Sequence, residues 1–238
     1  MKHKQPYIGF ARVYDQIMLD VPYVQWSEYI KWIWSSHSFY PNTVLDLACG
    51  TGNMTLSFAR EGYIASGIDM SAHMLEVARK KAREEGLFVP FTCQDMRNFT
   101  IDDPYDSVVC VFDSLNYLLN PSDVKSCFKS VYQALSPGGY FVFDMNTPLR
   151  LSTIGRDTNV FEGPWYFVVW RDCWDDKNQW WQVELTGFIK NNGRWQRFDE
   201  IHKERAFPIS SVKEWLKEAG FTVKGVYEPI TKKEASET

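Results

Sequence analysis

The sequence predicts an α/β fold, in which helices flank a mostly parallel central sheet and an antiparallel β-meander is inserted late in the chain. Between residues 43 and 146, short apolar runs alternate with stretches at helical spacing, which is the pattern of βαβ units. The apolar runs are nearly uninterrupted, as expected for strands that helices cover on both faces. After residue 150 the pattern changes to long strand-like runs joined by turn residues.

The first part of the chain supplies the expected sheet and its helices. A helical cap is expected over residues 1–40, with helical spacing at 7–34 and an interruption near Pro22. Ser71 is the expected N-cap of one helix, and Pro137-Gly138-Gly139 is the expected end of another. The spacing predicts strands over 43–48, 63–69, 88–95, 105–113 and 140–146, and helices over 54–61, 71–86 and 122–139.

The second part of the chain interrupts this domain and then completes it. Three strand-like runs cover 160–176, 179–190 and 194–207, and Asn192-Gly193 is a strong hairpin signal between the last two. A helix over 210–220 and a strand over 221–228 follow, and the polar tail 231–238 is expected to be disordered. We therefore expect one α/β domain formed by residues 1–149 and 207–230, with an antiparallel insert at 150–206 lying over it as a substrate lid.

Composition narrows the class of protein. The 238 residues suffice for one substantial domain with an insert, and a net charge of −4 argues against a protein that binds nucleic acid through phosphate neutralisation. The five cysteines are widely spaced without CxxC, which favours a reducing, cytoplasmic compartment without disulfides. The histidines have no partners at metal spacing, and no run approaches 18 apolar residues, so neither a metal nor a membrane span is expected. A monomer and a homodimer both remain open.

The stretch VLDLACGTGN, residues 44–53, predicts a cofactor-binding loop. Gly50 and Gly52 lack a Cβ, so the backbone can turn sharply and lie against a ligand, and the helix that follows offers its N-terminus. A dinucleotide would need Gly or Ala where Thr55 stands, and the acid at Asp46 would repel a pyrophosphate. S-adenosylmethionine fits better, because it carries an ammonium group and no phosphate.

Two more acids follow strands at the same expected edge of the sheet. Asp69 ends GIDMS, where a carboxylate can accept both hydroxyls of a ribose. Asp95, in CQDM, could bond an adenine amino group, with Met70 and Met96 as apolar walls.

Five segments in order, VLDLACGTGN, GIDMS, CQDM, YDSVVCVFDSLNYL and LSPGGYFVFDMN, resemble the successive motifs of class I S-adenosylmethionine-dependent methyltransferases. The resemblance covers residues 40–146. It implies a Rossmann-like fold and S-adenosyl-L-methionine as the cofactor, with S-adenosyl-L-homocysteine as the product. In this family Asp46 would order the methionine end, Asp69 would bind ribose and Asp95 would touch adenine.

A narrower resemblance involves both ends of the chain. The start FARVYDQIMLDVPYVQWSEYI and the late insert are similar to a bacterial subgroup of uncharacterised small methyltransferases and amino-sugar N,N-dimethyltransferases. In that subgroup N-terminal helix residues close over the cofactor, which points to Tyr14 and Trp26. The family has two strands after the last helix, whereas this sequence supplies one run. Either the last strand is absent or the insert takes its place.

The expected site gathers these residues. We expect catalytic roles for Asp113 and Tyr117, which follow the fourth strand, and for His202 on the insert, where it could act as a base. The expected cofactor-binding residues are Tyr14, Trp26, Asp46, Ala48, Cys49, Gly50, Gly52, Asp69, Met70, Asp95, Met96, Phe112 and Asp113.

The sequence thus favours a methyltransferase that acts by in-line displacement on a nitrogen or oxygen of a small molecule. Methyl transfer from a sulfonium mainly requires alignment of the nucleophile, and the acidic charge and the aromatic insert suit a small acceptor. A methyltransferase acting on tRNA or protein is the first alternative. An NAD-dependent oxidoreductase and a non-catalytic cofactor-binding protein are alternatives of other classes.

Overall fold

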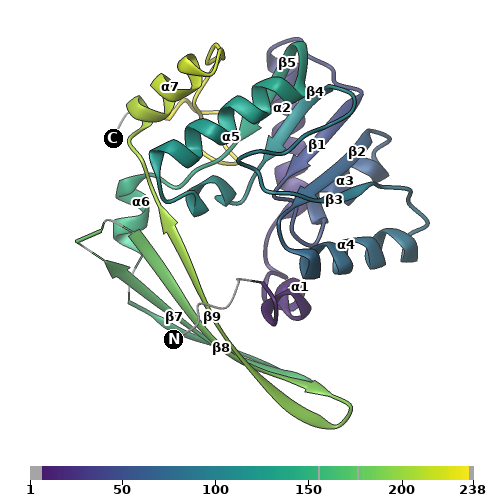
Figure 1. Cartoon of the computed structure of the whole chain (residues 1–238), viewed down its shortest axis with the longest axis vertical. Helices are drawn as coiled ribbons and strands as arrows, with labels where there is room; N and C mark the ends of the chain where they lie inside the picture. The colour runs from purple at the N-terminus through teal and green to yellow at the C-terminus, as the bar shows by residue number, and fades with distance from the viewer. Residues whose placement is uncertain (1–6, 155, 176, 179, 236–238) are drawn as a thin grey trace.

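The computed structural model describes residues 7–154, 156–175, 177–178 and 180–235. An α/β body forms the upper part of the molecule in Figure 1, and a separate antiparallel sheet extends below it. The short helix α1 (Tyr14–Ile17) lies at the junction of the two parts. The α/β class and the antiparallel insert are both as expected from the sequence.

The body contains a parallel sheet of five strands in the order β3-β2-β1-β4-β5. The chain order reverses between β1 and β4, and ligands bind outside the carboxyl ends of strands at such a switch point. The strands are β1 (Thr43–Leu47), β2 (Ile64–Asp69), β3 (Phe91–Cys93), β4 (Tyr105–Cys110) and β5 (Leu135–Phe143).

Helices cover both faces of this sheet. On one face Leu45 and Leu47 belong to the core that includes α5 and α7, while Val44 belongs to the core under α2 and α3. Because successive strand residues point to opposite faces, each strand needs apolar residues at consecutive positions. The helices are α2 (Tyr23–Ser36), α3 (Asn53–Arg60), α4 (Ala72–Glu84), α5 (Pro121–Ala134) and α7 (Ile209–Glu218), and Ser71 caps α4 as predicted.

The insert sheet consists of β6 (Thr158–Gly163), β7 (Tyr166–Asp175), β8 (Trp180–Asn191) and β9 (Arg194–Arg205), preceded by α6 (Pro148–Thr153). Asn192 and Gly193 have φ values of 47° and 77° and join β8 to β9 as a two-residue turn, which confirms the hairpin. The first expected run is in fact two strands, because Gly163 pairs with Tyr166 across a second tight turn.

The N-terminal residues join the two parts of the molecule. A third core places Phe10 of the single-turn helix η1 (Phe10–Arg12) and Val13 against Val168, Leu185 and Phe198 of the insert sheet. The insert sheet therefore packs against the N-terminal cap as well as the body. The cap fills the space between the two parts.

Two boundaries in the body differ from expectation. The helix expected over 122–139 is α5, and it ends at Ala134, because residues 135–139 already belong to β5. There Leu135 pairs with Tyr105, and a register shift precedes the pairing of Tyr140 with Ser107. The strand expected over 88–95 is reduced to three residues after Pro90, which cannot donate to a ladder.

The strand expected over 221–228 does not form, and this prediction is wrong. Residues 226–235 turn back on themselves instead, with Glu228 N–H donating to the Lys233 carbonyl at 3.0 Å and Ala235 N–H to the Val226 carbonyl at 2.9 Å. Of the tail expected to be disordered, residues 231–235 belong to this turn, and 236–238 lie outside the described residues. The insert forms its own sheet, so within the described ranges β5 pairs only with β4.

Candidate active site

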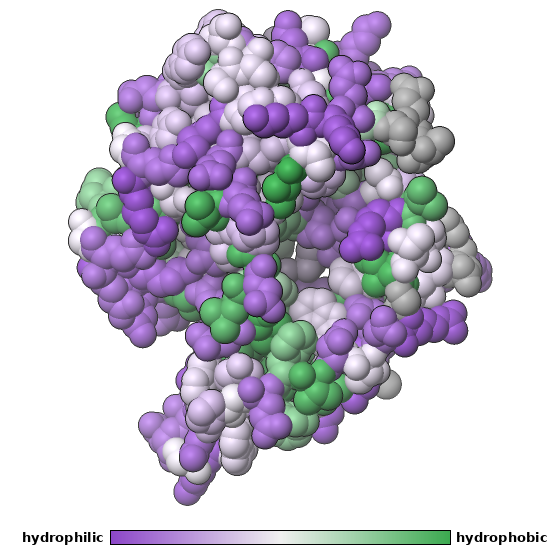
Figure 2. Space-filling view, turned by 180° about the vertical axis from the view of Figure 1, so that it is seen from behind, coloured by the Kyte–Doolittle hydropathy of each residue, from purple (hydrophilic) through white to green (hydrophobic). Residues whose placement is uncertain are grey.

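One cavity of about 610 Å³ lies where the carboxyl ends of the parallel strands meet the N-terminal cap and the insert sheet. Figure 2 shows the surface hollowed where the two parts of the molecule meet, with hydrophobic side chains gathered below the hollow. The cavity is lined from the body by Asp46, Asp69 and Asp113, from the cap by Tyr7 and Tyr14, and from the insert sheet by Trp170, Trp181, Val183, Leu185, His202 and Glu204.

The glycine loop between β1 and α3 forms part of the wall. Gly50 has φ 54° and lines the cavity, and a Cβ added there would meet nothing closer than the Met74 Cε at 3.8 Å. Glycine is therefore needed for the left-handed backbone and leaves the cavity open. Ala48 (φ 59°) and Cys49 also line the cavity.

Gly52 is placed differently from Gly50. It is not among the residues that line the cavity, and a Cβ there would lie 3.0 Å from the Ala78 Cβ and 3.1 Å from the Phe91 ring. Its φ is 78°. Gly52 therefore permits close packing of the loop against α4 and β3.

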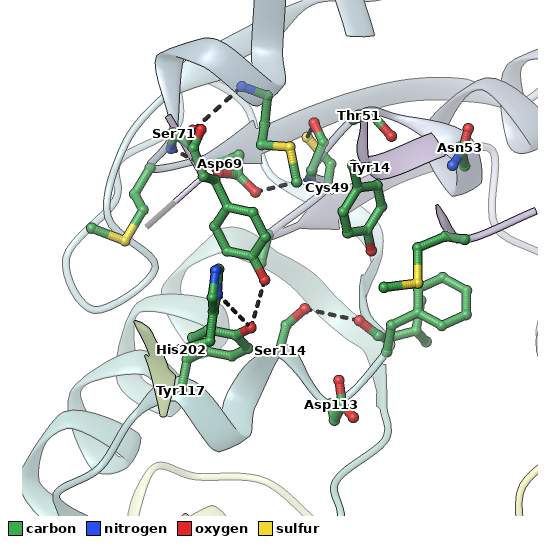
Figure 3. Close-up of a pocket in the computed structure, with 18 of the residues that line it drawn as sticks. Tyr14, Cys49, Thr51, Asn53, Asp69, Ser71, Asp113, Ser114, Tyr117 and His202 are labelled. Carbon is green, nitrogen blue, oxygen red and sulfur yellow. Dashed lines mark hydrogen bonds between the residues drawn. The ribbon is translucent and has the colours of Figure 1, made fainter. Parts of the chain in front are cut away.

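The carboxylate of Asp69 is fixed beside this loop. Its Oδ1 accepts the Ser71 N–H at 2.7 Å and its Oδ2 accepts the Gly50 N–H at 2.9 Å. Burial raises the pKa of Asp69 above its ordinary value, although these two hydrogen bonds lower it in part. The remaining lone pairs of a carboxylate held in this way suit a ligand diol. Asp69 and Ser71 are labelled in Figure 3.

Asp46 is buried two residues before Ala48. Burial raises its pKa to about 7; the hydroxyl of Thr55, which donates at 2.5 Å, lowers it in part, and the charge of Asp69 raises it. A positive group in the cavity would favour the charged form of this carboxyl. Asp46 therefore suits the ammonium group of an amino acid.

The N-terminal cap is fastened to the glycine loop by Asp15. Its Oδ1 accepts the Thr51 hydroxyl at 2.6 Å and the Asn53 amide at 3.0 Å, and its Oδ2 pairs with Lys81 Nζ at 2.8 Å. This places the neighbouring Tyr14 in the cavity wall. The sequence reasoning selected Tyr14 and missed Asp15, although the acid stands beside it.

Trp26 and Phe112 close another side of the cavity. Their rings meet edge to face at 5.4 Å, and both line the wall as expected. Phe112 and Asp113 have φ values of 61° and 52°, which are uncommon for residues with a side chain and occur at functional sites. The Asp113 N–H is held by the Asp144 carboxylate at 3.2 Å.

Three buried carboxyl groups meet at this end of the cavity. The Asp113 carboxylate accepts the amide of Asn146 at 2.8 Å, and the same amide reaches Glu204 at 3.4 Å. Burial raises the pKa of Asp113, raises that of Asp144 to about 7 and raises that of Glu204, and repulsion from Asp113 adds to the shifts of the other two. Such a cluster stabilises a positive charge placed beside it.

Tyr117 and His202 come together from different parts of the chain. The Tyr117 hydroxyl, on the short helix η2 (Ser114–Tyr117), lies 3.2 Å from Nδ1 of His202 on β9, as the dashed line in Figure 3 shows. The same hydroxyl lies 2.6 Å from that of Tyr7. Tyr7 was missed by the sequence reasoning, since nothing in its neighbours marks it.

Asp95 lies outside the cavity, contrary to expectation. Its carboxylate pairs with the guanidinium of Arg97, whose Nη2 is 2.5 Å away, and that hydrogen bond is the largest influence holding the pKa of Asp95 below its ordinary value. The flanking residues Gln94 and Met96 line the cavity instead, as does Met70. No group of His, Cys, Asp and Glu suited to a metal ion occurs in the described part of the chain. All five cysteines are free.

A second cavity of about 1140 Å³ lies along the unpaired edge of β5. Its walls come mainly from α2, β5 and residues 220–229. These segments carry neither the glycine loop nor Asp69, so we take the smaller cavity as the candidate active site. No helix within the described ranges is long and apolar enough to cross a membrane.

Comparisons with known proteins agree with this geometry. A family model described as a methyltransferase domain matches residues 44–139. The protein YqeM of Bacillus subtilis (strain 168), whose name assigns it provisionally to the methyltransferases, is 36% identical over 232 residues, which cover 97% of this chain and 92% of YqeM.

Solved structures extend the similarity to the whole fold. The S-adenosylmethionine-dependent methyltransferase from Clostridium acetobutylicum ATCC 824 matches with a TM-score of 0.83 and 31% identity, over 98% of this chain and 94% of that one. The sugar N-methyltransferase KedS8 from Streptoalloteichus sp ATCC 53650 shares the fold, with a TM-score of 0.73 and 21% identity over 91% and 84% of the two chains. The chain belongs to the class I S-adenosylmethionine-dependent methyltransferase family.

Proposed function

We propose that this chain transfers a methyl group to a nitrogen or oxygen of a small molecule bound between the α/β body and the insert sheet. The observation that supports this most strongly is that a single cavity of about 610 Å³ is lined from both parts of the molecule. That volume lies within the usual range of small-ligand pockets, about 300–1,000 Å³. A cofactor and a small acceptor would meet inside it.

We assign the cofactor to the end of the cavity formed by the body. Asp69 would bind the ribose, Asp46 the methionine end, and Met70 and Met96 the adenine faces, while Asp95 and Gly52 have no contact role. The wall around them is formed by Tyr14, Trp26, Ala48, Cys49, Gly50, Phe112 and Asp113. S-adenosylmethionine, when bound, supplies a methyl group on a positively charged sulfur, which makes that methyl group electrophilic.

The contribution of the protein is then alignment and charge. Asp113, Asp144 and Glu204 are buried carboxyl groups whose pKa values burial raises, and a sulfonium or an ammonium group bound beside them would favour their charged forms and be stabilised by them. The aromatic residues of the insert sheet exclude water from the same space. Holding a nucleophile in line can by itself lower a barrier by about 7–11 kcal/mol.

A small acceptor is favoured over tRNA or protein. The chain has a net charge of −4, so a polyanion would be repelled. A sugar N-methyltransferase of the same fold is compatible with an amine acceptor. Membership of the methyltransferase family argues against an NAD-dependent oxidoreductase. The following test distinguishes a methyltransferase from a non-catalytic cofactor-binding protein.

Transfer of a labelled methyl group from S-adenosylmethionine tests the proposal. The purified chain would be incubated separately with pools of small amines (amino sugars included), of phenols and alcohols, of bulk tRNA and of bulk protein. We expect label in a small-molecule pool and none with Asp69→Ala. Label in tRNA or protein alone would contradict the proposal, and cofactor binding without label in any pool would indicate a non-catalytic protein.

A further inference from the structure

The buried carboxylate of Glu200 accepts hydrogen bonds from the first described residues of the chain. Glu200, on β9, is only 3% exposed, and its two oxygens accept the backbone N–H groups of residues 7–10 at distances of 2.7–3.0 Å. Tyr7 has φ 62°, a left-handed conformation in which successive N–H groups converge on an anion. A tyrosine adopts this conformation at a cost, which the four hydrogen bonds offset.

Glu200 is charged in spite of its burial. Burial by itself raises the pKa of this carboxyl, but hydrogen bonds from His202 and from the backbone of Phe10, Tyr7 and Gly9 outweigh it and hold the pKa below its ordinary value. A charged carboxylate only accepts hydrogen bonds. Every group that bonds to Glu200 must therefore present a hydrogen atom to it.

This requirement fixes the direction of a chain of hydrogen bonds. Nε2 of His202 lies 3.2 Å from Glu200 and must carry the hydrogen, which leaves Nδ1 of a neutral imidazole as an acceptor. The Tyr117 hydroxyl then donates to Nδ1 across 3.2 Å, and its oxygen accepts from the Tyr7 hydroxyl at 2.6 Å. The Tyr7 oxygen keeps its accepting lone pairs, and Tyr7 lines the cavity.

We propose that Tyr7, Tyr117, His202 and Glu200 form a proton relay that takes up the proton of the methyl acceptor, and that residues 7–10 assemble the relay by closing onto Glu200. Tyr7 is the catalytic residue, because it faces the acceptor, and the other three act through it. The proposal rests on the proposed function, since it concerns the acceptor in the same cavity.

The transfer balances without any further reactant. For an acceptor X–H, the X–H bond breaks and leaves its electron pair on X, and an electron pair of X forms the bond to the methyl carbon. The bond between the methyl carbon and the sulfur of the bound cofactor would break at the same time, with its electron pair left on the sulfur, which would become neutral. The proton passes to Tyr7, the Tyr7 proton passes to Tyr117, and the Tyr117 proton forms an N–H bond at Nδ1 of His202. Both phenols end as they began, and the imidazolium faces the carboxylate of Glu200 until solvent takes the proton.

The two phenols are suited to pass a proton on and not to ionise. Burial is the main cause that raises the pKa of Tyr7 and of Tyr117, and the negative charges of Glu204 and Asp113 raise both further. A phenolate is therefore not formed in advance. The titratable groups that face the imidazole are Glu200 and Glu204 of β9, Tyr117 of η2 and Tyr7, and its aromatic neighbour is Phe10.

The relay and the closure of the cavity share one segment. Residues 7–10 supply both the catalytic hydroxyl and the N–H groups that keep Glu200 charged. If the segment leaves β9, Tyr7 leaves the cavity and His202 loses its ordered partner. The relay also selects the acceptor, because it serves a hydroxyl or an amine that still carries a proton and offers nothing to a thioether or a tertiary amine.

The tautomer of His202 tests the relay without any acceptor. In ¹⁵N-histidine spectra of the full chain, with the signal assigned by His202→Gln, we expect neutral His202 to carry its hydrogen on Nε2. In Glu200→Gln this preference for Nε2 should weaken, because an amide replaces the charged group that accepts the Nε2 hydrogen. Glu184→Gln is the matched control, since Glu184 is exposed on the adjacent strand β8. Hydrogen on Nδ1 in the wild-type chain, or an unchanged preference in Glu200→Gln, would overturn the relay.

Amide hydrogen exchange tests the assembly of the relay. Loss of a charged acceptor from four N–H groups should speed exchange of residues 7–10 at least about tenfold in Glu200→Gln, and leave it unchanged in Glu184→Gln. If exchange of these amides does not change in Glu200→Gln, residues 7–10 are not held by Glu200, and this part of the proposal is wrong.

With an acceptor from the labelled-methyl assay, turnover separates the relay from the proposed function. Tyr7→Phe removes one hydroxyl, and we expect kcat to fall about 100-fold with affinity for S-adenosylhomocysteine unchanged. In Glu200→Gln the acid limb of the pH profile of kcat should move to lower pH. If Glu200 had only a structural role, kcat would instead change by the same factor at every pH. Normal turnover by Tyr7→Phe would overturn the relay alone. Absence of label with the wild-type chain would overturn the proposed function and leave the histidine spectra to decide the relay.

Discussion

At the scale of single residues, we expect Asp69 to be the side chain on which cofactor binding depends most. Its two oxygens accept the N–H groups of Gly50 and Ser71, so the carboxylate orders the glycine loop, and it also lines the cavity. A charged acceptor held at two points needs no rearrangement when a diol binds. Removal of this carboxylate should therefore weaken binding without unfolding the sheet.

We expect Asp69→Ala to lower the affinity for S-adenosylmethionine and S-adenosylhomocysteine by roughly 1.5–3 kcal/mol, the usual contribution of hydrogen bonds to a charged group. Calorimetric titration with both compounds and with NADH would measure this, and NADH should not bind. Asp95→Ala is the control, because that carboxylate pairs with Arg97 outside the cavity. Equal affinities of the two variants would show that the ribose lies elsewhere.

The sequence predicted part of this site for a physical reason. Asp46 and Asp69 stand at or near the ends of buried parallel strands, and such ends meet at one edge. Asp95 shares that edge, but its direction is set by Arg97, which strand patterns do not reveal. Tyr7 and Glu200 are 193 residues apart in the chain, so only the folded structure shows that they bond.

At the scale of elements, α1 is held on the glycine loop by a few polar contacts. Asp15 accepts from Thr51, Asn53 and Lys81, and these bonds connect the N-terminal cap to the cofactor edge of the sheet. Because α1 has only four residues, it cannot hold this position by its own helical stability. The cap therefore depends on Asp15 for its place.

We expect Asp15→Asn to weaken S-adenosylhomocysteine binding several-fold and to lower stability by about 1 kcal/mol, since an amide replaces a charged acceptor at a partly buried pair. Thermal unfolding and calorimetric titration of the variant would measure both. Glu28→Gln, on the exposed face of α2, is the matched control. If Asp15→Asn behaves as that control does, the cap is held by other contacts.

The errors in the expected elements lie at their ends and at the last strand. Pro137-Gly138-Gly139 is a strong stop signal, yet the helix ends earlier because the chain joins the β4 ladder from Leu135. The run 221–228 has strand-like residues, but its end belongs to a turn over 226–235, in which Val226 and Glu228 make local backbone hydrogen bonds. Pairing of this kind is decided by tertiary contacts and not by the local sequence.

At the scale of the whole molecule, the cavity brings together several buried acids, and among the described residues that line it there is no lysine or arginine. Burial raises the pKa of Asp46 and of Asp144 from 3.8 to about 7. In the folded chain both carboxyls hold a proton at pH values where the unfolded chain has released it. Their contribution to stability is therefore complete below about pH 4 and is lost as the pH rises through about 7.

We expect the melting temperature of the ligand-free chain to fall by on the order of 5–10 °C between pH 5 and pH 8. Calorimetric melting across that range would measure the slope. The pKa of Glu200 is lowered, so its contribution to stability is lost only as the pH falls below about 5. It therefore does not change the slope of the melting temperature between pH 5 and pH 8. Asp144→Asn should flatten the slope. A melting temperature that rises steadily over this range in the wild-type chain would contradict the assignment.

The arrangement of the two parts could not be predicted from the sequence. The class of the fold followed from alternating elements, and the Asn192-Gly193 turn located one hairpin. The N-terminal cap, however, shares one hydrophobic core with the insert sheet, which includes Phe10, Leu185 and Phe198. The site is completed by residues from the two ends of the chain, and no local pattern records that.

Hydrogen–deuterium exchange of the whole chain with and without S-adenosylhomocysteine would test most directly whether the N-terminal cap and the body form one cofactor site. We predict joint protection of residues 7–14, 46–53 and 69–74, which surround the smaller cavity. The larger cavity at the edge of β5 should show no change. Protection confined to residues 135–147 and 220–229 would place the ligand in that second cavity and would contradict the site described here.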